Sequence, residues 1–226
     1  MIYFTTVAYR EPYIQQSYKM INSIREFCPE AKIAIVTDLP EMFDGLDVIV
    51  HKGPDCEYKP WFKANYKSYA FEPLIDIVQP DDIVIFLDCD CTLARSVTQD
   101  DYNHLPYGLA VALGKTASQV YPEEVQNGAI RTKILGINPD ANQKYHVFRE
   151  AFLAFKVDDL FFEFVEAWKT ICAEIDYKQL NHANVTFDIQ NAALRAGIPI
   201  YNISNDDHLW KTVLTATIDG GISIMV

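Results

Sequence analysis

The segment at residues 82–88 of this 226-residue chain reads DIVIFLD, an apolar run with no polar residue in its interior. Continuous apolar runs of this length are typical of central strands covered on both faces, whereas strands of one-sided sheets alternate apolar and polar residues. Apolar runs and helical patterns also alternate along the rest of the chain. This alternation predicts an α/β/α sandwich with a mainly parallel central sheet.

The other elements follow from the period of the apolar residues. Short runs rich in β-forming residues predict strands at 2–8, 32–38, 46–51, 108–114, 147–156 and 198–203. Apolar residues three or four apart predict helices at 12–28, 158–175 and 186–196, and a mostly helical segment at 58–78 that Pro60 and Pro73 limit. Residues 115–146 show no period and are predicted to form a long loop. In such folds ligands are expected at the carboxyl ends of the strands.

Charge and composition exclude several kinds of partner. The net charge is −12 and the pI is about 4.7, whereas binding to nucleic acid or to an anionic membrane requires a basic surface. The sequence shows no membrane span and no signal peptide pattern. Its five cysteines, an odd number, indicate reduced thiols. Together these features predict a cytoplasmic protein.

Two carboxylates follow the apolar strand directly. Asp88 ends the strand and Asp90 comes two residues later, and in an extended segment residues two apart point to the same side. Such a pair can hold Mn²⁺ or Mg²⁺ and leave coordination positions open for phosphate oxygens. The intervening thiols do not suit these ions, and the spacing of zinc-binding cysteines is absent from the sequence. The alternative is a polar turn with no metal, which is less favoured directly after a buried strand.

The stretch IVIFLDCDCTL, residues 83–93, resembles two families. One comprises the GT-A fold glycosyltransferases, in which an Asp-x-Asp pair after a central strand binds the metal of a nucleotide sugar. The other comprises the haloacid-dehalogenase-like phosphatases, in which Asp88 would be the nucleophile. The phosphatase motif usually ends the first strand, whereas several elements precede it here. The glycosyltransferase is therefore the favoured reading, and the alternatives are the phosphatase or a catalytically degraded nucleotide-binding domain.

The flanking segments resemble the glycogenin-like and bacterial lipopolysaccharide galactosyltransferases in order and spacing. By this resemblance Thr6, Ala8 and Tyr13 would contact the nucleotide base, and Lys67 would face the phosphates. The resemblance implies a GT-A-like, Rossmann-like fold and a nucleoside diphosphate sugar donor, with a UDP-sugar favoured. It leaves the acceptor unknown.

The second half of the chain resembles this family less closely. Asp188, with Gln190 two residues later, matches the acidic and amide residues near the reacting sugar, and His208 is the candidate third metal ligand. The segment HVFREAF, residues 146–152, stands where the family has an Asn-x-Gly turn. The resemblance implies one domain over 1–226, with residues 1–93 binding nucleotide and metal and residues 94–226 binding sugar and acceptor.

Overall fold

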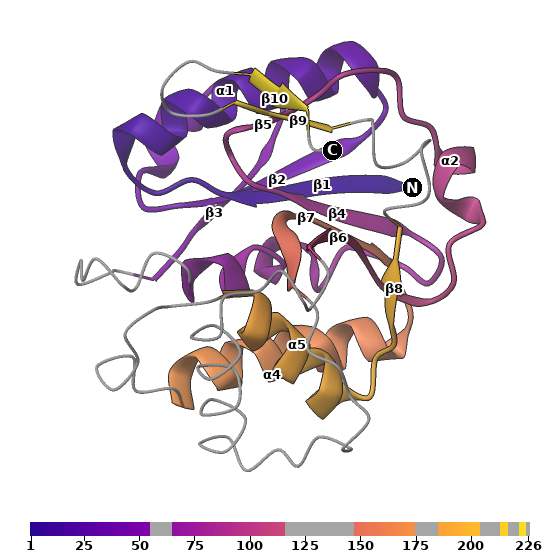
Figure 1. Cartoon of the computed structure of the whole chain (residues 1–226). Helices are drawn as coiled ribbons and strands as arrows, with labels where there is room; N and C mark the ends of the chain where they lie inside the picture. The colour runs from indigo at the N-terminus through magenta and orange to yellow at the C-terminus, as the bar shows by residue number, and fades with distance from the viewer. Residues whose placement is uncertain (55–64, 116–146, 175–184, 204–212, 217–221, 225–226) are drawn as a thin grey trace.

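The computed structural model describes residues 1–54, 65–115, 147–174, 185–203, 213–216 and 222–224. Its centre is a seven-stranded sheet in the order β3-β2-β1-β4-β7-β6-β8 (Figure 1). In chain order these strands are β1 (Ile2–Val7), β2 (Lys32–Thr37), β3 (Ile49–Lys52), β4 (Ile83–Leu87), β6 (Gly108–Lys115), β7 (Val147–Lys156) and β8 (Ile200–Asn202).

Most neighbouring strands of this sheet run parallel, as the sequence predicts. The pairs β2–β3, β1–β2, β1–β4 and β6–β8 are parallel. The exception is β7, which lies antiparallel between β4 and β6. The carboxyl end of β4 therefore lies beside the first half of β7, because antiparallel neighbours run in opposite directions.

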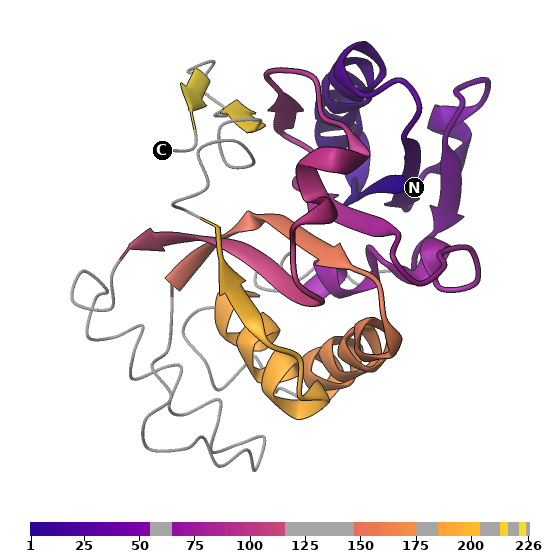
Figure 2. The ribbon, with the colours of Figure 1, turned by 90° about the vertical axis from the view of Figure 1, so that its right-hand side faces the viewer.

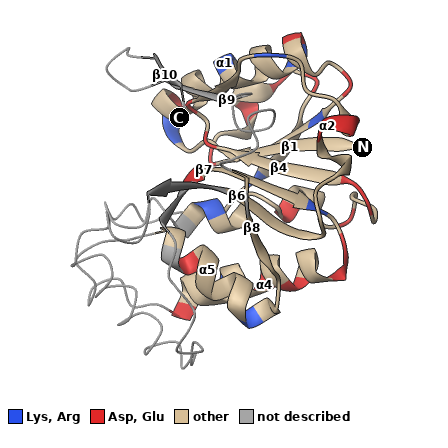
Figure 3. Ribbon diagram, turned by 45° about the vertical axis from the view of Figure 1, so that its right-hand side comes forward, with Lys and Arg blue, Asp and Glu red and all other residues tan. Residues whose placement is uncertain are grey.

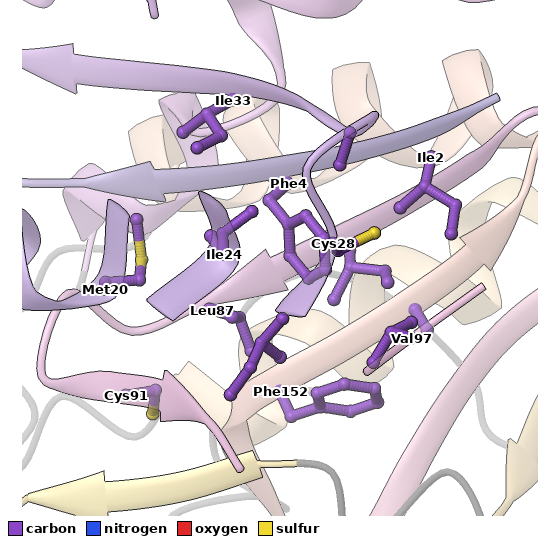
Figure 4. Close-up of a cluster of buried hydrophobic side chains, with 14 of the residues drawn as sticks. Ile2, Phe4, Met20, Ile24, Cys28, Ile33, Leu87, Cys91, Val97 and Phe152 are labelled. Atoms are coloured by element: carbon purple, nitrogen blue, oxygen red, sulfur yellow. The ribbon is translucent and has the colours of Figure 1, made fainter. Parts of the chain in front are cut away.

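Helices cover both faces of the sheet (Figures 1 and 2). α1 (Arg10–Phe27) lies on one face, while α4 (Asp159–Glu174) and α5 (Val185–Ala196) lie on the other. Alternate residues of β4 serve the two cores: Ile83, Ile85 and Leu87 pack on the α1 side, and Val84 and Phe86 pack on the α4 side. Part of the α1-side core is drawn in Figure 4. This double burial explains why β4 is apolar without interruption.

The α4-side core is centred on one aromatic ring, Phe71. This fully buried ring contacts the rings of Phe86, Phe155, Phe161, Phe164 and Trp168, with centroids 5.5 to 6.5 Å away. The contacts with Phe155, Phe161 and Phe164 are edge-to-face, and such contacts add to the free energy gained by burying apolar area. Phe71 lies two residues after the turn η3 (Asn65–Tyr69) and therefore anchors that turn against the sheet.

Three parts of the structure depart from the sequence-based prediction. The described part of the expected helix at 58–78 forms two 3-10 turns, η3 and η4 (Glu72–Leu74). Pro73 at the start of η4 and the burial of Phe71 favour short turns over a continuous helix. The short helix α2 (Gln99–Asn103) and a second sheet of β5 (Cys91–Leu93), β9 (Val213–Ala216) and β10 (Ile222–Ile224) were not predicted.

The surface of the described residues carries charges of both signs. Figure 3 shows acidic residues on α1, α2 and α4, with basic residues interspersed. Among the described residues, no helix is both long enough and apolar enough to cross a bilayer. The expected loop at 115–146 falls, apart from Lys115, outside the described residues.

Candidate functional site

Asp88 and Asp90 lie in a tight turn at the carboxyl end of β4. The amide of Cys91 donates to the carbonyl of Asp88 at 2.8 Å, and the amide of Asp88 donates to the carbonyl of Ala151 in β7 at 3.0 Å. The two aspartates are partly exposed, whereas Cys89 and Cys91 are buried. The extended geometry expected from the sequence is thus replaced by a turn. The alternation of accessible carboxylates and buried thiols is retained.

Lys67 binds Asp88 through both carboxylate oxygens. The Nζ atom lies 2.7 Å from Oδ1 and 2.8 Å from Oδ2. Both side chains are largely buried, with 20% of Lys67 and 24% of Asp88 exposed. The ammonium also lies 5.8 Å from the centre of the Phe86 ring. Two short charge-assisted contacts in a partly buried place make this a stronger ion pair than those on an open surface.

Glu150 of β7 adds a third carboxylate that the sequence reasoning missed. The hydroxyl of Thr186 in α5 donates to its Oε2 at 3.4 Å. The register of β6 on β7 shifts between the pairs Val111–Leu153 and Leu113–Phe148, and irregularities of this kind redirect side chains. The departure of HVFREAF from the family's Asn-x-Gly turn marked this segment as different from the family, but it did not indicate where Glu150 lies.

Burial and neighbouring charges shift the pKa values of Asp88, Lys67 and Cys89. Burial raises the pKa of Asp88, and the carboxylates of Glu150 and Asp90 raise it further, while Lys67 opposes the rise. Burial acts to lower the pKa of Lys67, but Asp88 and Glu150 outweigh it, so that the net pKa is raised. Burial, together with the negative charge of Asp88 and Asp90, raises the pKa of Cys89 to about 12. Cys89 is therefore a neutral thiol at physiological pH.

Residues predicted to contact the base lie at the carboxyl end of β1 and just beyond it. Thr6 and Ala8 are fully buried, and the amide of Ala8 donates to the carbonyl of Val36 at 2.9 Å. Tyr13, on α1, is partly buried and packs against the core on that face of the sheet. Their contact with a base remains a prediction.

An aromatic pair at the same edge was not predicted from the sequence. The rings of Tyr9 and Tyr66 stack at 4.8 Å with an interplanar angle of 18°. The hydroxyl of Tyr9 donates to the carbonyl of Pro54, which follows β3, at 3.3 Å. Gly53 makes room for this hydroxyl, because a Cβ there would overlap it. Tyr66 and Lys67 are neighbours in η3, so this turn contacts both the aromatic pair and the carboxylates.

The residues expected near the reacting sugar lie at the start of α5. Asp188 and Gln190 are buried, with 1% and 5% exposed, in the same turns of the helix as Thr186. The contact between Thr186 and Glu150 brings this helix end beside β7. The catalytic roles of Asp188 and Gln190 remain predictions. His208 lies outside the described residues.

Asp88 and Asp90 could supply only some of the ligands that a divalent ion needs. Within the described ranges, no cluster of at least three His, Cys, Asp or Glu residues is arranged to hold a metal ion. Mg²⁺ and similar ions are often held by one or two carboxylates, with phosphate oxygens of the substrate and water filling the other positions. Asp88 and Asp90 fit that pattern in residue type and in position at a strand end.

The fold of the chain is similar to that of a protein of known structure. The chain is similar to a galactosyltransferase, LgtC, whose crystal structure was determined in complex with donor and acceptor sugar analogues. The two share 15% sequence identity and a TM-score of 0.53, over 90% of this chain and 74% of LgtC. This likeness confirms the predicted GT-A-like α/β fold. No protein-family model matches the chain, and the comparison with curated proteins yields no match.

Proposed function

We propose that the protein is a metal-dependent glycosyltransferase that moves a sugar from a nucleoside diphosphate sugar to an acceptor. The observation that carries the proposal is the group of Asp88, Asp90, Glu150 and Lys67 at the carboxyl end of β4. Ligands of open α/β sheets bind at this edge. The GT-A-like fold supports the reading, since LgtC, of similar fold, was crystallised with donor and acceptor sugar analogues.

At the donor end, Asp88 and Asp90 would hold Mn²⁺ or Mg²⁺, with His208 as a further ligand. When bound there, the ion supplies positive charge that stabilises the diphosphate as a leaving group. Lys67 would bind a phosphate oxygen and add to that charge. Thr6, Ala8 and Tyr13 would contact the base, with a UDP-sugar as the favoured donor.

At the sugar end, three side chains are proposed to orient the reactants. Asp188 and Gln190 would act near the anomeric carbon, on the helix that Thr186 ties to β7. Glu150 would accept a hydrogen bond from a sugar hydroxyl. We propose a single domain, with residues 1–93 binding nucleotide and metal and residues 94–226 binding the sugar and an acceptor of unknown identity.

We place the protein in the cytoplasm as part of the same proposal. Cys28, Cys89 and Cys91 are free, buried thiols, and free thiols persist in reducing compartments. A nucleotide-sugar donor is also compatible with a cytoplasmic enzyme.

The test is to incubate the protein with UDP-, GDP- and CDP-sugars in the presence of Mn²⁺ and to measure release of the nucleoside diphosphate. Release from one donor, lost in Asp90→Asn, would support the proposal, since water can replace the missing acceptor. Release of inorganic phosphate from p-nitrophenyl phosphate without donor turnover would instead support a phosphatase. Metal-dependent nucleotide binding without turnover would indicate a binding domain.

A further inference from the structure

Asp88, one of the two proposed metal ligands, already binds a cation in this structure, the ammonium of Lys67. Lys67 Nζ lies 2.7 and 2.8 Å from the two oxygens of Asp88. A divalent ion and this ammonium need the same oxygen atoms. Binding of one therefore disfavours binding of the other, and the buried position of the pair strengthens the competition.

We propose that Lys67 competes with the metal ion for Asp88 and leaves this carboxylate when a diphosphate arrives. The inference rests on the proposed function, because the diphosphate would give Lys67 a new anionic partner. In the free protein Lys67 neutralises Asp88. In the complex it contacts phosphate and leaves Asp88 to the metal ion.

The surroundings of Lys67 allow the side chain to move while the backbone stays in place. The backbone that follows η3 is held against the sheet, because the hydroxyl of Thr5 in β1 donates to the carbonyl of Ala70 and the ring of Phe71 is fully buried. A lysine side chain has four rotatable bonds and can redirect its ammonium without moving such a backbone. Glu150 also attracts Lys67, so the ammonium keeps a carboxylate nearby after it leaves Asp88.

The turn η3 also contacts the residue that follows β1, through the stacked rings of Tyr66 and Tyr9. Tyr66 precedes Lys67 and stacks on Tyr9 at 4.8 Å. In the free protein η3 therefore contacts both Tyr9, which follows β1, and Asp88, which follows β4.

Competition of this kind makes metal and nucleotide binding interdependent. The metal ion alone must displace Lys67 and therefore binds weakly, whereas a diphosphate offers Lys67 an alternative partner. The nucleotide then raises the metal affinity, and by thermodynamic linkage the metal ion raises the nucleotide affinity by the same factor.

The experiment is an electron paramagnetic resonance titration of Mn²⁺ at mildly alkaline pH, with and without UDP. It compares the native protein with Lys67→Met and with the matched control Lys156→Met. Lys156 is also a largely buried lysine paired with an aspartate. It lies at the carboxyl end of β7, beside the amino end of β4 and away from Asp88. Lys67→Met is expected to bind Mn²⁺ alone about tenfold more tightly, because one strong ion pair is removed. Lys156→Met is expected to behave as the native protein.

Two further variants keep the test decisive. Lys67→Gln is a second neutral replacement in case Lys67→Met does not fold, and Lys67→Arg keeps the charge and should keep the weak binding of Mn²⁺ alone. The proposal is overturned if both neutral variants bind Mn²⁺ alone as weakly as the native protein while the nucleotide still enhances binding. If no protein binds Mn²⁺ even with nucleotide, the proposed function fails, and this inference fails with it.

Discussion

The two ends of strand β4 both carry aspartates that pair with amino groups, yet the two arrangements differ. At the amino end, Asp82 binds the Met1 ammonium at 2.6 Å, and Asp81 lies 2.6 Å from the Tyr107 hydroxyl and 3.5 Å from Lys156. At the carboxyl end, Lys67 contacts Asp88, while Asp90 and Glu150 add negative charge around it.

Asp81 at the amino end and Asp88 at the carboxyl end differ in exposure and in the direction of their pKa shifts. Asp81 is 65% exposed, and the hydrogen bond from Tyr107 lowers its pKa. Asp88 is 24% exposed, and burial raises its pKa. At the amino end, the Tyr107 hydroxyl and Lys156 thus stabilise the ionised form of Asp81 without a further cation. The carboxyl end gathers partly buried carboxylates in an arrangement that a further cation would stabilise, as the proposed ligand site requires.

The largest effect is expected from the same substitution made at each end of β4. Asp88→Asn should reduce release of the nucleoside diphosphate by roughly 100-fold or more, because it removes a group that stabilises the leaving group electrostatically. Asp81→Asn should leave that rate unchanged. Steady-state kinetics with the preferred donor measure both. Equal losses in the two variants would mean that the ends of β4 do not differ in function.

A second pair of variants compares two glycines that admit no side chain. Gly53→Ala should displace the Tyr9 hydroxyl and bring a methyl group within 2.8 Å of Val36. Because Tyr9 stacks on Tyr66, which precedes Lys67, the change should raise KM for the donor by about tenfold through lost positioning of Lys67. Gly108, at the amino end of β6, has φ +132, and an added Cβ would lie 2.6 Å from the carbonyl of Pro199. Gly108→Ala should lower the free energy of unfolding by about 1–3 kcal/mol. An unchanged KM in Gly53→Ala would separate Tyr9 from donor binding.

Asp82→Asn should affect stability and leave catalysis intact. The variant weakens the contact with the Met1 ammonium and the hydrogen bond that the Gln79 amide donates to Oδ2 at 2.8 Å. Its expected cost is about 1–2 kcal/mol in the free energy of unfolding, measured by urea denaturation. Asp76→Asn, an exposed aspartate of the same segment, is the matched control and should be neutral. A loss of donor turnover in Asp82→Asn would contradict a purely structural amino end.

The smallest effect is expected at Tyr107. Its hydroxyl holds the pKa of Asp81 below the ordinary value of 3.8, with Lys156 contributing. A lowered pKa in the folded state adds stability that is complete above the ordinary value and is lost as the pH falls through the folded value. In Tyr107→Phe the pKa of Asp81 should return toward 3.8, as followed by a carbon NMR titration of the carboxyl group. An unchanged titration would show that the hydrogen bond is absent in solution.

What the sequence could predict depended on local pattern. The apolar run at 82–88 sufficed to place β4 at the centre of the sheet with Asp88 at its end, since burial on both faces leaves a direct trace in composition. Glu150 could not be placed, because its position depends on the antiparallel insertion of β7 and on a register shift against β6. Tyr9 was missed because its ring is set by Gly53 and Pro54 from a distant strand.

Calorimetric titration of UDP, GDP and CDP, each with and without Mn²⁺, tests the central claim most directly. The proteins to compare are the native chain, Asp90→Asn and Asp81→Asn. The account expects one diphosphate to bind in a Mn²⁺-dependent manner to the native chain and to Asp81→Asn, and binding to be lost in Asp90→Asn. Absence of binding to all three nucleotides, or equal binding to Asp90→Asn, would contradict a nucleotide-sugar site at the carboxyl end of β4.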